Sequence, residues 1–273
     1  MEIQVLGPLS AAVNDVSIVP TARKPRQLLA LFAFYPGRIM PVSTLMEELW
    51  GAEMPPSAIT TLQTYVLQLR RRLRMATGPT APDNAKEIIT TQHGGYALRI
   101  PAESVDLHRY EQLAARGRRA FERGDDGQAA TLLQGALDLW NGPALVDVRA
   151  GSILSIELVR LEESRLVTVE RRIDADLRLG RHSELIAELA DLIARHPQHE
   201  GLHSQAMVAL YRSGRQATAL DVYRRLRRRL TDELGVEPSP QLQRLHQMML
   251  TVDPALDVVA GTRRASTFDL YAA

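Results

Sequence analysis

The sequence predicts a mainly α protein in two parts, a small α+β unit at the N-terminus followed by an all-α helical repeat. Three observations predict this division. Short β-rich segments enclose three helical segments in the first hundred residues, a glycine-centred pattern recurs 34 residues apart in the second part, and a length of 273 residues suits two domains of ordinary size.

The composition is that of a soluble globular protein. Hydrophobic residues make up 45% of the chain and charged residues 24%, and no apolar run approaches the ~18 to 20 residues that span a bilayer. The N-terminus lacks the basic and apolar regions of a secretory signal, and the absence of cysteine excludes a disulfide scaffold. We therefore expect a cytoplasmic protein that does not enter a membrane.

The chain opens with a predicted small antiparallel sheet. Gly7-Pro8 and Asn14-Asp15 separate short apolar pieces, which is typical of hairpins. A first helix follows, with Pro25 in its first turn and Pro36-Gly37 at its end.

A short second helix is predicted from Thr44, because Thr44 and Glu47 have the spacing of a capping box and Gly51 closes the segment. Ser57 is then a good N-cap for a third helix.

The third helix has two predicted faces. On a helical wheel, the expected buried stripe comprises Ile59, Leu62, Val66, Leu69 and Leu73. The opposite side comprises Thr60, Thr64, Leu67, Gln68 and Arg71. Hydroxyl, amide and guanidinium groups reach base edges or phosphates, and an outward leucine can meet a thymine methyl or a partner protein. A solvated helix face would show the same pattern, so the helix alone leaves both interpretations open.

The surroundings of this helix favour DNA. Residues 60–100 carry six Lys/Arg and two Asp/Glu, so basic charge is concentrated there. Two β-rich pieces around Gly94-Gly95 predict a terminal hairpin. A sheet, three helices and a hairpin make a winged helix-turn-helix, in which the third helix enters the major groove and the hairpin reaches the neighbouring backbone or minor groove.

The second part contains an internal repeat. LRLGRHSELIAEL and YRSGRQATALDVY align with Gly180 opposite Gly214, and FERGDDGQAATLL places Gly124 in the same role. A 34-residue period with a glycine turn between two helices is typical of a tetratricopeptide-like helical repeat. Such repeats stack into surfaces that hold another protein or part of the same chain.

One motif indicates an enzyme instead. Residues 199–203 read H-E-G-L-H, the pattern of a zinc hydrolase. Gly201 suits the middle of a metal-bearing helix poorly, Ala209 stands where a third ligand would be needed, and Pro197 marks a repeat boundary. We therefore interpret Glu200 as a favourable charge at a helix N-terminus and the two histidines as surface groups. We expect no metal, no cofactor and no enzymatic activity, since phosphate-loop and G-x-S-x-G motifs are also missing.

A second arginine-rich run, YRRLRRRL at 223–230, precedes Asp232 and Glu233. We interpret it as a charge-paired helix surface rather than a second DNA surface.

Several motifs resemble one family along nearly the whole chain. RKPRQLLALFAFYPG, ELWG at 48–51, LQTYVLQLRRRL and the terminal GGY are similar to OmpR-type winged-helix DNA-binding domains, in the N-terminal form of the Streptomyces antibiotic regulatory protein (SARP) family. LDLWNGPAL, ALYRSGRQ and ELGVEPSP are similar to the bacterial transcriptional activation domain of that family. The expected domains are a winged helix over 1–100, an activation domain over 105–251 and a flexible tail over 252–273.

The resemblance implies a sequence-specific transcriptional activator of a secondary-metabolite (antibiotic) biosynthetic gene cluster. It implies binding to direct repeats in double-stranded DNA near the promoter −35 region, as a dimer or side-by-side oligomer, and recruitment of RNA polymerase holoenzyme at the nucleoid. A protein-binding scaffold with a merely structural winged helix is the second hypothesis, and it predicts a stable partner without sequence-selective DNA binding.

The resemblance also assigns DNA contacts. The groove-facing positions are Thr60, Thr64, Gln68 and Arg71, with Arg70 and Arg72 towards phosphate. The wing contributes Thr90, Thr91, Gln92 and His93, and the start of the first helix contributes backbone contacts from Arg23, Lys24 and Arg26. Many OmpR-type wings carry arginine where Gln92 stands and a basic residue where Gln68 stands, so the chain departs from the family pattern at two contacts.

Overall fold

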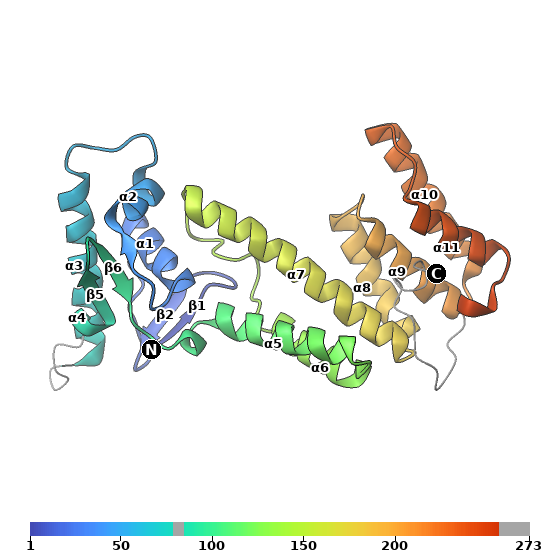
Figure 1. Ribbon diagram of the computed structural model, residues 1–273, viewed down its shortest axis with the longest axis horizontal. Helices are drawn as coiled ribbons and strands as arrows, with labels where there is room; N and C mark the ends of the chain where they lie inside the picture. Colours follow the sequence, from blue (N-terminus) through green and yellow to red (C-terminus); the bar gives the residue numbers. More distant parts are fainter. Residues whose placement is uncertain (79–84, 257–273) are drawn as a thin grey trace. The chain divides into compact units, whose positions relative to one another are not determined.

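The computed structural model describes residues 1–78 and 85–256, which form two compact units (Figure 1). The first unit contains Met1–Leu113 and Gly135–Leu166, and the second contains Ala114–Gln134 and the chain from Val167 on. The expected mainly α class is confirmed, with a small winged α+β domain followed by a helical repeat.

The first unit opens with a three-stranded antiparallel sheet. Its strands are β1 (Glu2–Gln4), β2 (Ser10–Val13) and β3 (Val16–Ser17), in the order β1-β2-β3. The turn between β2 and β3 consists of Asn14 and Asp15, whose φ angles of 49° and 62° are left-handed. Asparagine and aspartate tolerate this conformation better than other residues with a Cβ atom, so the predicted hairpin forms at the predicted dipeptide.

Three helices follow as predicted, with a fourth short one after residues 79–84, which lie outside the described part of the chain. They are α1 (Arg23–Phe34), α2 (Val42–Trp50), α3 (Ala58–Thr77) and α4 (Ala85–Ile88). The predicted start of α2 at Thr44 is wrong. Its N-cap is Pro41 without any side-chain cap, because the chain passes directly into the helix from strand β4 (Met40–Pro41).

The terminal hairpin forms with an extra strand that the sequence did not predict. Strands β5 (Ile89–Gln92) and β6 (Gly95–Leu98) pair antiparallel, and β4 adds to β6 to give the order β4-β6-β5. His93 and Gly94 form the turn with φ angles of 44° and 75°. A Cβ atom on Gly95 would lie 2.4 Å from the carbonyl oxygen of Met40, so only glycine permits this close pairing.

The edge of the first sheet is tied to the start of helix α5 (Asp106–Glu122), which follows the 3₁₀ turn η1 (Ala102–Ser104). The buried carboxylate of Asp106 accepts hydrogen bonds from the backbone N–H groups of Val5 (2.8 Å) and Leu6 (3.1 Å). Burial raises the pKa of Asp106, and these two backbone donors oppose that rise. The winged helix and the first turn of α5 therefore share one hydrogen-bonded junction.

A second buried carboxylate joins α2 to the N-terminus of helix α7 (Ser152–Arg178). Glu48 accepts hydrogen bonds from the backbone N–H groups of Gly151 (2.7 Å), Ile153 (2.9 Å) and Leu154 (3.1 Å). Gln27 of α1 donates to the same carboxylate from Nε2 at 2.8 Å. The N–H groups of a first helical turn have no partner within their own helix, so Glu48 satisfies them from outside.

Three further polar contacts lie at the same junction within the first unit. Asp147 accepts from the backbone N–H of Leu9 at 2.7 Å and pairs with Arg26 at 3.0 Å. Tyr35 donates to Glu157 at 2.8 Å, and burial together with this carboxylate raises the pKa of Tyr35 to about 12. These contacts attach residues 106–113 and 135–166 to the winged helix. The first unit therefore continues beyond residue 105.

The second unit consists of helices arranged as the repeat predicts. The unit includes parts of α5, of α6 (Asp126–Leu137) and of α7. Four more helices follow in the chain: α8 (His182–Arg195), α9 (Glu200–Arg212), α10 (Gln216–Leu234) and α11 (Pro240–Leu250). The three aligned glycines, Gly124, Gly180 and Gly214, have left-handed φ angles of 77°, 84° and 75° between successive helices. Glycine adopts this conformation without a Cβ clash, which explains its place in each turn.

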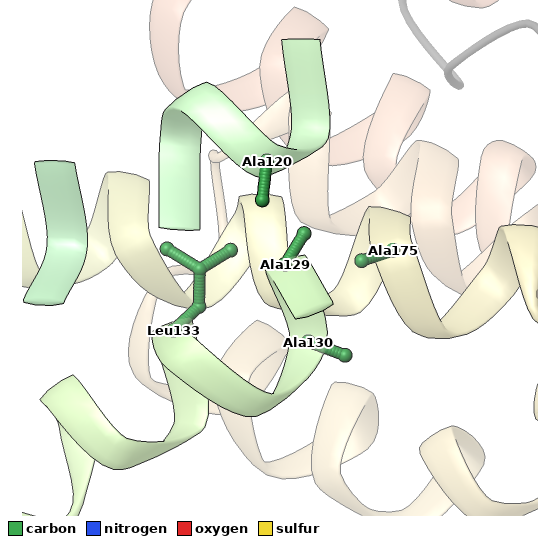
Figure 2. Close-up of a cluster of buried hydrophobic side chains, with 5 residues drawn as sticks. All are labelled: Ala120, Ala129, Ala130, Leu133 and Ala175. Atoms are coloured by element: carbon green, nitrogen blue, oxygen red, sulfur yellow. The ribbon is translucent and has the colours of Figure 1, made fainter. Parts of the chain in front are cut away.

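Small residues fill the crossing of α5, α6 and α7 within this unit. Figure 2 shows Ala120 above Ala129, with Leu133 and Ala175 beside them, and all four side chains are fully buried. A Cβ atom on Gly117 would lie 2.6 Å from Cγ of Leu133. Alanine and glycine therefore let the helices approach closely.

The expected tail over 252–273 lies largely outside the described residues, since these end at 256. The described part forms the 3₁₀ turn η2 (Pro254–Leu256), where Leu256 is buried. Arg212 donates to the carbonyl oxygen of Leu256 at 2.8 Å, so residues up to 256 pack on the second unit.

Replacing Glu48 by alanine should lower the free energy of unfolding by about 2 to 4 kcal/mol, because several buried donors lose their charged acceptor. Urea denaturation of the full chain measures this loss. Glu47→Ala is the matched control, since Glu47 is exposed and makes only a 3.3 Å contact with Ser152. Equal losses in the two variants would contradict the role assigned to Glu48.

Candidate nucleic-acid interface

Helix α3 has one apolar face and one polar face. Its buried side chains are Ala58, Leu62, Val66, Leu69, Leu73 and Ala76. All five residues predicted to face outward are exposed: Thr60, Thr64, Leu67, Gln68 and Arg71. The helix thus turns a polar surface with one leucine, 58% exposed, away from the core.

The prediction for Ile59 is wrong, since this side chain is 56% exposed rather than buried. Ala58 occupies the buried position in the first turn, one turn before Leu62. Ile59 lies at the edge of the apolar stripe and at the end of the helix, where no neighbouring element covers it in the described part of the chain.

Basic charge on α3 is not offset within the helix, because its sequence contains four arginines and no acidic residue. One of the four is held by the protein itself. Arg70 donates from Nε (3.0 Å) and Nη2 (2.7 Å) to the carbonyl oxygen of Ile89, and from Nη2 to Oγ1 of Thr91 at 2.9 Å. Its guanidinium joins α3 to the β5–β6 wing. A phosphate bound by Arg70 would therefore compete with the carbonyl oxygen of Ile89 and the hydroxyl of Thr91 for the same guanidinium.

The wing presents its polar residues unevenly. Thr91 and His93 are exposed, whereas Thr90 and Gln92 are half-buried. Thr90 makes a long 3.5 Å contact with the carbonyl oxygen of Ala97 across the hairpin. Thr91 and the tip residue His93 are therefore the accessible two of the four predicted wing contacts.

A hollow of about 400 Å³ lies between α3 and the segment that leads into α1. Gln68, Arg71 and Arg72 line it from α3, and Ser17 and Thr21 are among the residues that line it from the other side. Two guanidinium groups, an amide and two hydroxyls thus converge from segments about fifty residues apart in sequence. These donors, in a lining without acidic residues, suit the oxygen atoms of a nucleic-acid backbone.

The three cations predicted at the start of α1 have different surroundings. Arg23 is exposed. Lys24 lies 4.5 Å above the ring of Trp50, and burial, Arg23 and Arg149 lower its pKa. Arg26 pairs with Asp147 and donates to the carbonyl oxygen of Pro20. Of the three cations, Arg23 is therefore the exposed one.

Ser17, Thr21 and Trp50 lie beside the predicted DNA contacts, although no pattern in the sequence indicated it. Trp50 stacks on Tyr65 of α3, with ring centroids 6.2 Å apart and 16° between the planes. A helical wheel treats each helix alone, so it gives no signal for residues that another segment brings to the same surface.

The H-E-G-L-H segment does not form a metal-binding constellation. His199 is the N-cap of α9, and its Nδ1 accepts from the backbone N–H of Leu202 at 3.4 Å. Glu200 accepts from the backbone N–H of Ser239 at 2.9 Å. Within the ranges 1–78 and 85–256, no three His, Asp or Glu side chains are grouped to hold a metal ion.

The expectation that both histidines lie on the surface is wrong for His203, which is 5% exposed. Helix α9 packs against both α8 and α10, so the side chain one turn after the N-cap enters the core. Its Nδ1 lies 3.1 Å from the carbonyl oxygen of His199.

Three of the five arginines in the run on α10 are paired with acidic residues. Arg225 pairs with Asp221 at 2.6 Å, and Arg229 pairs with Glu233 at 3.2 Å. Arg227 forms two hydrogen bonds with Glu237, at 2.7 and 2.9 Å.

Two known families match successive parts of the chain. The family described as "Transcriptional regulatory protein, C terminal" matches residues 17–98, which include α3 and the wing. The family described as "Bacterial transcriptional activator domain" matches residues 105–250. "Regulatory protein DnrI" of Streptomyces peucetius is 50% identical over 257 residues, which cover 94% of each chain.

The protein belongs to the SARP family. "Transcriptional regulator RedD" of Streptomyces coelicolor is 37% identical over 97% of this chain and 74% of its own. "Regulatory protein AfsR" of the same species is 41% identical over 97% of this chain, which spans only 26% of that relative.

A solved structure of a relative with lower sequence identity shows the same fold. "Mycobacterium tuberculosis EmbR in complex with low affinity phosphopeptide" has a TM-score of 0.85 and 32% identity. The match covers 93% of this chain and 65% of the EmbR chain. This SARP protein is therefore a DNA-binding transcriptional regulator of a family whose matched relatives are named as regulators rather than enzymes. No helix in its described residues is long and apolar enough to cross a membrane.

Replacing Arg70 by alanine should loosen the wing, since its guanidinium makes three hydrogen bonds to β5. Amide exchange in Ile89–Gln92 should accelerate by about 10- to 100-fold, as expected for the loss of hydrogen bonds from a charged group. Hydrogen–deuterium exchange with mass spectrometry measures this change. Arg74→Ala is the control on the same helix, and equal acceleration there, or none in Arg70→Ala, would contradict the bracing role.

Proposed function

We propose that this SARP protein activates transcription of a secondary-metabolite gene cluster by binding direct repeats near the promoter −35 region. The observation that carries the proposal is the exposed face of α3, which combines hydroxyl, amide and guanidinium groups beside a wing and carries no acidic residue. An anionic duplex favours such a surface, and hydroxyls and amides can read base edges. The relatives DnrI and RedD are named as regulators, which supports a role in transcription regulation.

In this proposal residues 1–100 form the DNA-binding domain and 105–251 the activation domain. Thr60, Thr64, Gln68 and Arg71 read the major groove, while Arg72 and Arg23 contact phosphate. His93 and Thr91 reach the neighbouring backbone from the wing. Arg70, Lys24 and Arg26 contribute mainly by holding α3, the wing and α1 in place, because each already contacts another part of the protein.

Two or more subunits side by side would lengthen the sequence that is read, because a single recognition helix contacts only a few base pairs. The helical repeat would then present a protein-binding surface to RNA polymerase holoenzyme, since stacked repeats commonly bind other proteins. DNA as the partner places the protein at the nucleoid in the cytoplasm. Mapping bound DNA across the genome gives the operator and the regulated genes together, and binding without any site selectivity would favour the scaffold hypothesis.

Arg71→Ala should weaken binding to the mapped operator by about 1 to 3 kcal/mol and relax its base preference. Arg72→Ala should weaken all sequences alike and reduce the slope of log affinity against log salt by about one unit, as for one lost phosphate contact. Fluorescence anisotropy at several salt concentrations separates these effects.

The matched control is Arg244→Ala, an exposed arginine on α11. It should leave both the affinity and the salt slope unchanged. Unchanged affinity and slope in both α3 variants would remove this helix from the interface and with it the proposed mode of DNA binding.

A further inference from the structure

The second unit contains a groove that the proposed DNA-binding function does not use. Helices α8 and α10 both pack against α9 (Figure 1), and a groove of about 700 Å³ runs between them. Its apolar lining comes from all three helices: Ile186, Ala190, Ile193, Ala206, Leu210, Val222 and Leu226. This volume lies within the range of protein ligand pockets and has room for several side chains of a bound segment.

The rim of the groove is basic. Arg215, Arg225, Arg228 and Arg229 line it, against two acidic residues, Asp232 and Glu233. Arg225 and Arg229 are paired with acids of α10 itself, at Asp221 and Glu233. The lining therefore keeps an excess of positive charge next to its apolar surface.

A histidine on the floor of the groove has its pKa lowered in part by this positive charge. His203 lines the groove from α9 and is buried. Burial lowers its pKa, and the nearby charges of Arg229 and Arg225 lower it further. A ligand that brings negative charge to the rim would offset this potential, whereas a basic ligand would be repelled.

Apolar and basic surfaces lie side by side in this groove, and this combination favours a protein segment over a DNA backbone as the ligand. A DNA backbone would satisfy the arginines but would leave the exposed parts of Ile186 and Ile193 facing charged phosphates. An amphipathic helix or strand can place apolar side chains on the floor and carboxylates on the rim at the same time.

We propose that the groove between α8 and α10 binds an acidic, amphipathic segment of a partner protein. Its apolar side chains occupy the space between Ile186, Ala190 and Leu226, and its carboxylates lie near Arg215 and Arg228. The site is separate from the residues assigned to DNA, so the two activities can be tested independently.

The probes are fluorescein-labelled synthetic peptides of about 16 residues, with leucine at helical spacing and glutamate between. A matched set replaces every glutamate by lysine. The 273-residue chain should bind members of the acidic set with dissociation constants on the order of micromolar. It should bind the lysine set at least about tenfold more weakly, which corresponds to ~1.4 kcal/mol.

Three variants locate the binding. Arg228→Glu reverses charge on the rim, and Ala190→Trp fills the groove from an exposed position on α8. Each should weaken peptide binding at least about tenfold while leaving DNA affinity and the unfolding transition unchanged. Arg244→Glu on α11 applies the same charge reversal outside the groove and should leave peptide binding unchanged.

Several outcomes would overturn the proposal. Equal binding of acidic and basic sets, or no binding of any acidic peptide, excludes an acidic segment as the occupant. Loss of DNA affinity in Arg228→Glu assigns the groove to nucleic acid. A dimer that Ala190→Trp dissociates in sedimentation, without peptide binding in the wild type, assigns the groove to a second copy of the chain.

Discussion

The buried carboxylate of Glu48 is the contact on which the first unit depends. It accepts three backbone N–H groups at the start of α7 and one side-chain amide from α1, and it stands on α2, which packs against α3. A carboxylate removed from water is costly unless donors surround it, and unpaired N–H groups of a first helical turn are costly as well. The carboxylate and these donors satisfy each other, so α2, against which α3 packs, is fixed to the start of α7 within the first unit.

Other junctions in the first unit follow the same principle. Asp106 accepts the backbone N–H groups of Val5 and Leu6, and Asp147 accepts that of Leu9 while pairing with Arg26. Directional contacts between backbone donors and carboxylates specify one relative arrangement, whereas apolar contact alone tolerates several. The winged helix and the segments 106–113 and 135–166 therefore form one compact unit, although the matched families divide the chain near residue 100.

The candidate interface separates into two groups of residues that look alike in the sequence. Thr60, Thr64, Gln68 and Arg71 are exposed, and their orientation follows from the period of α3. Arg70, Lys24 and Arg26 are also basic residues near the interface, yet they contact the wing, Trp50 and Asp147. The helical period predicts which side of a helix faces outward. It contains no information about which neighbouring carbonyl, ring or carboxylate will reach a long cationic side chain.

The sequence by itself determined the mainly α class, the order of sheet, helices and hairpin, the glycine turns at Gly124, Gly180 and Gly214, and the outward face of α3. These features arise from local periodicity and from backbone angles that few residues adopt. Only the tertiary structure decided the third wing strand β4, the exposure of Ile59, the burial of His203 and the junctions made by Glu48 and Asp106. Each of these depends on which other segment does or does not lie beside a residue. For β4 and the two carboxylate junctions the partners are more than fifty residues apart in the sequence, and for His203 they are the adjacent helices α8 and α10, so no local pattern predicts them.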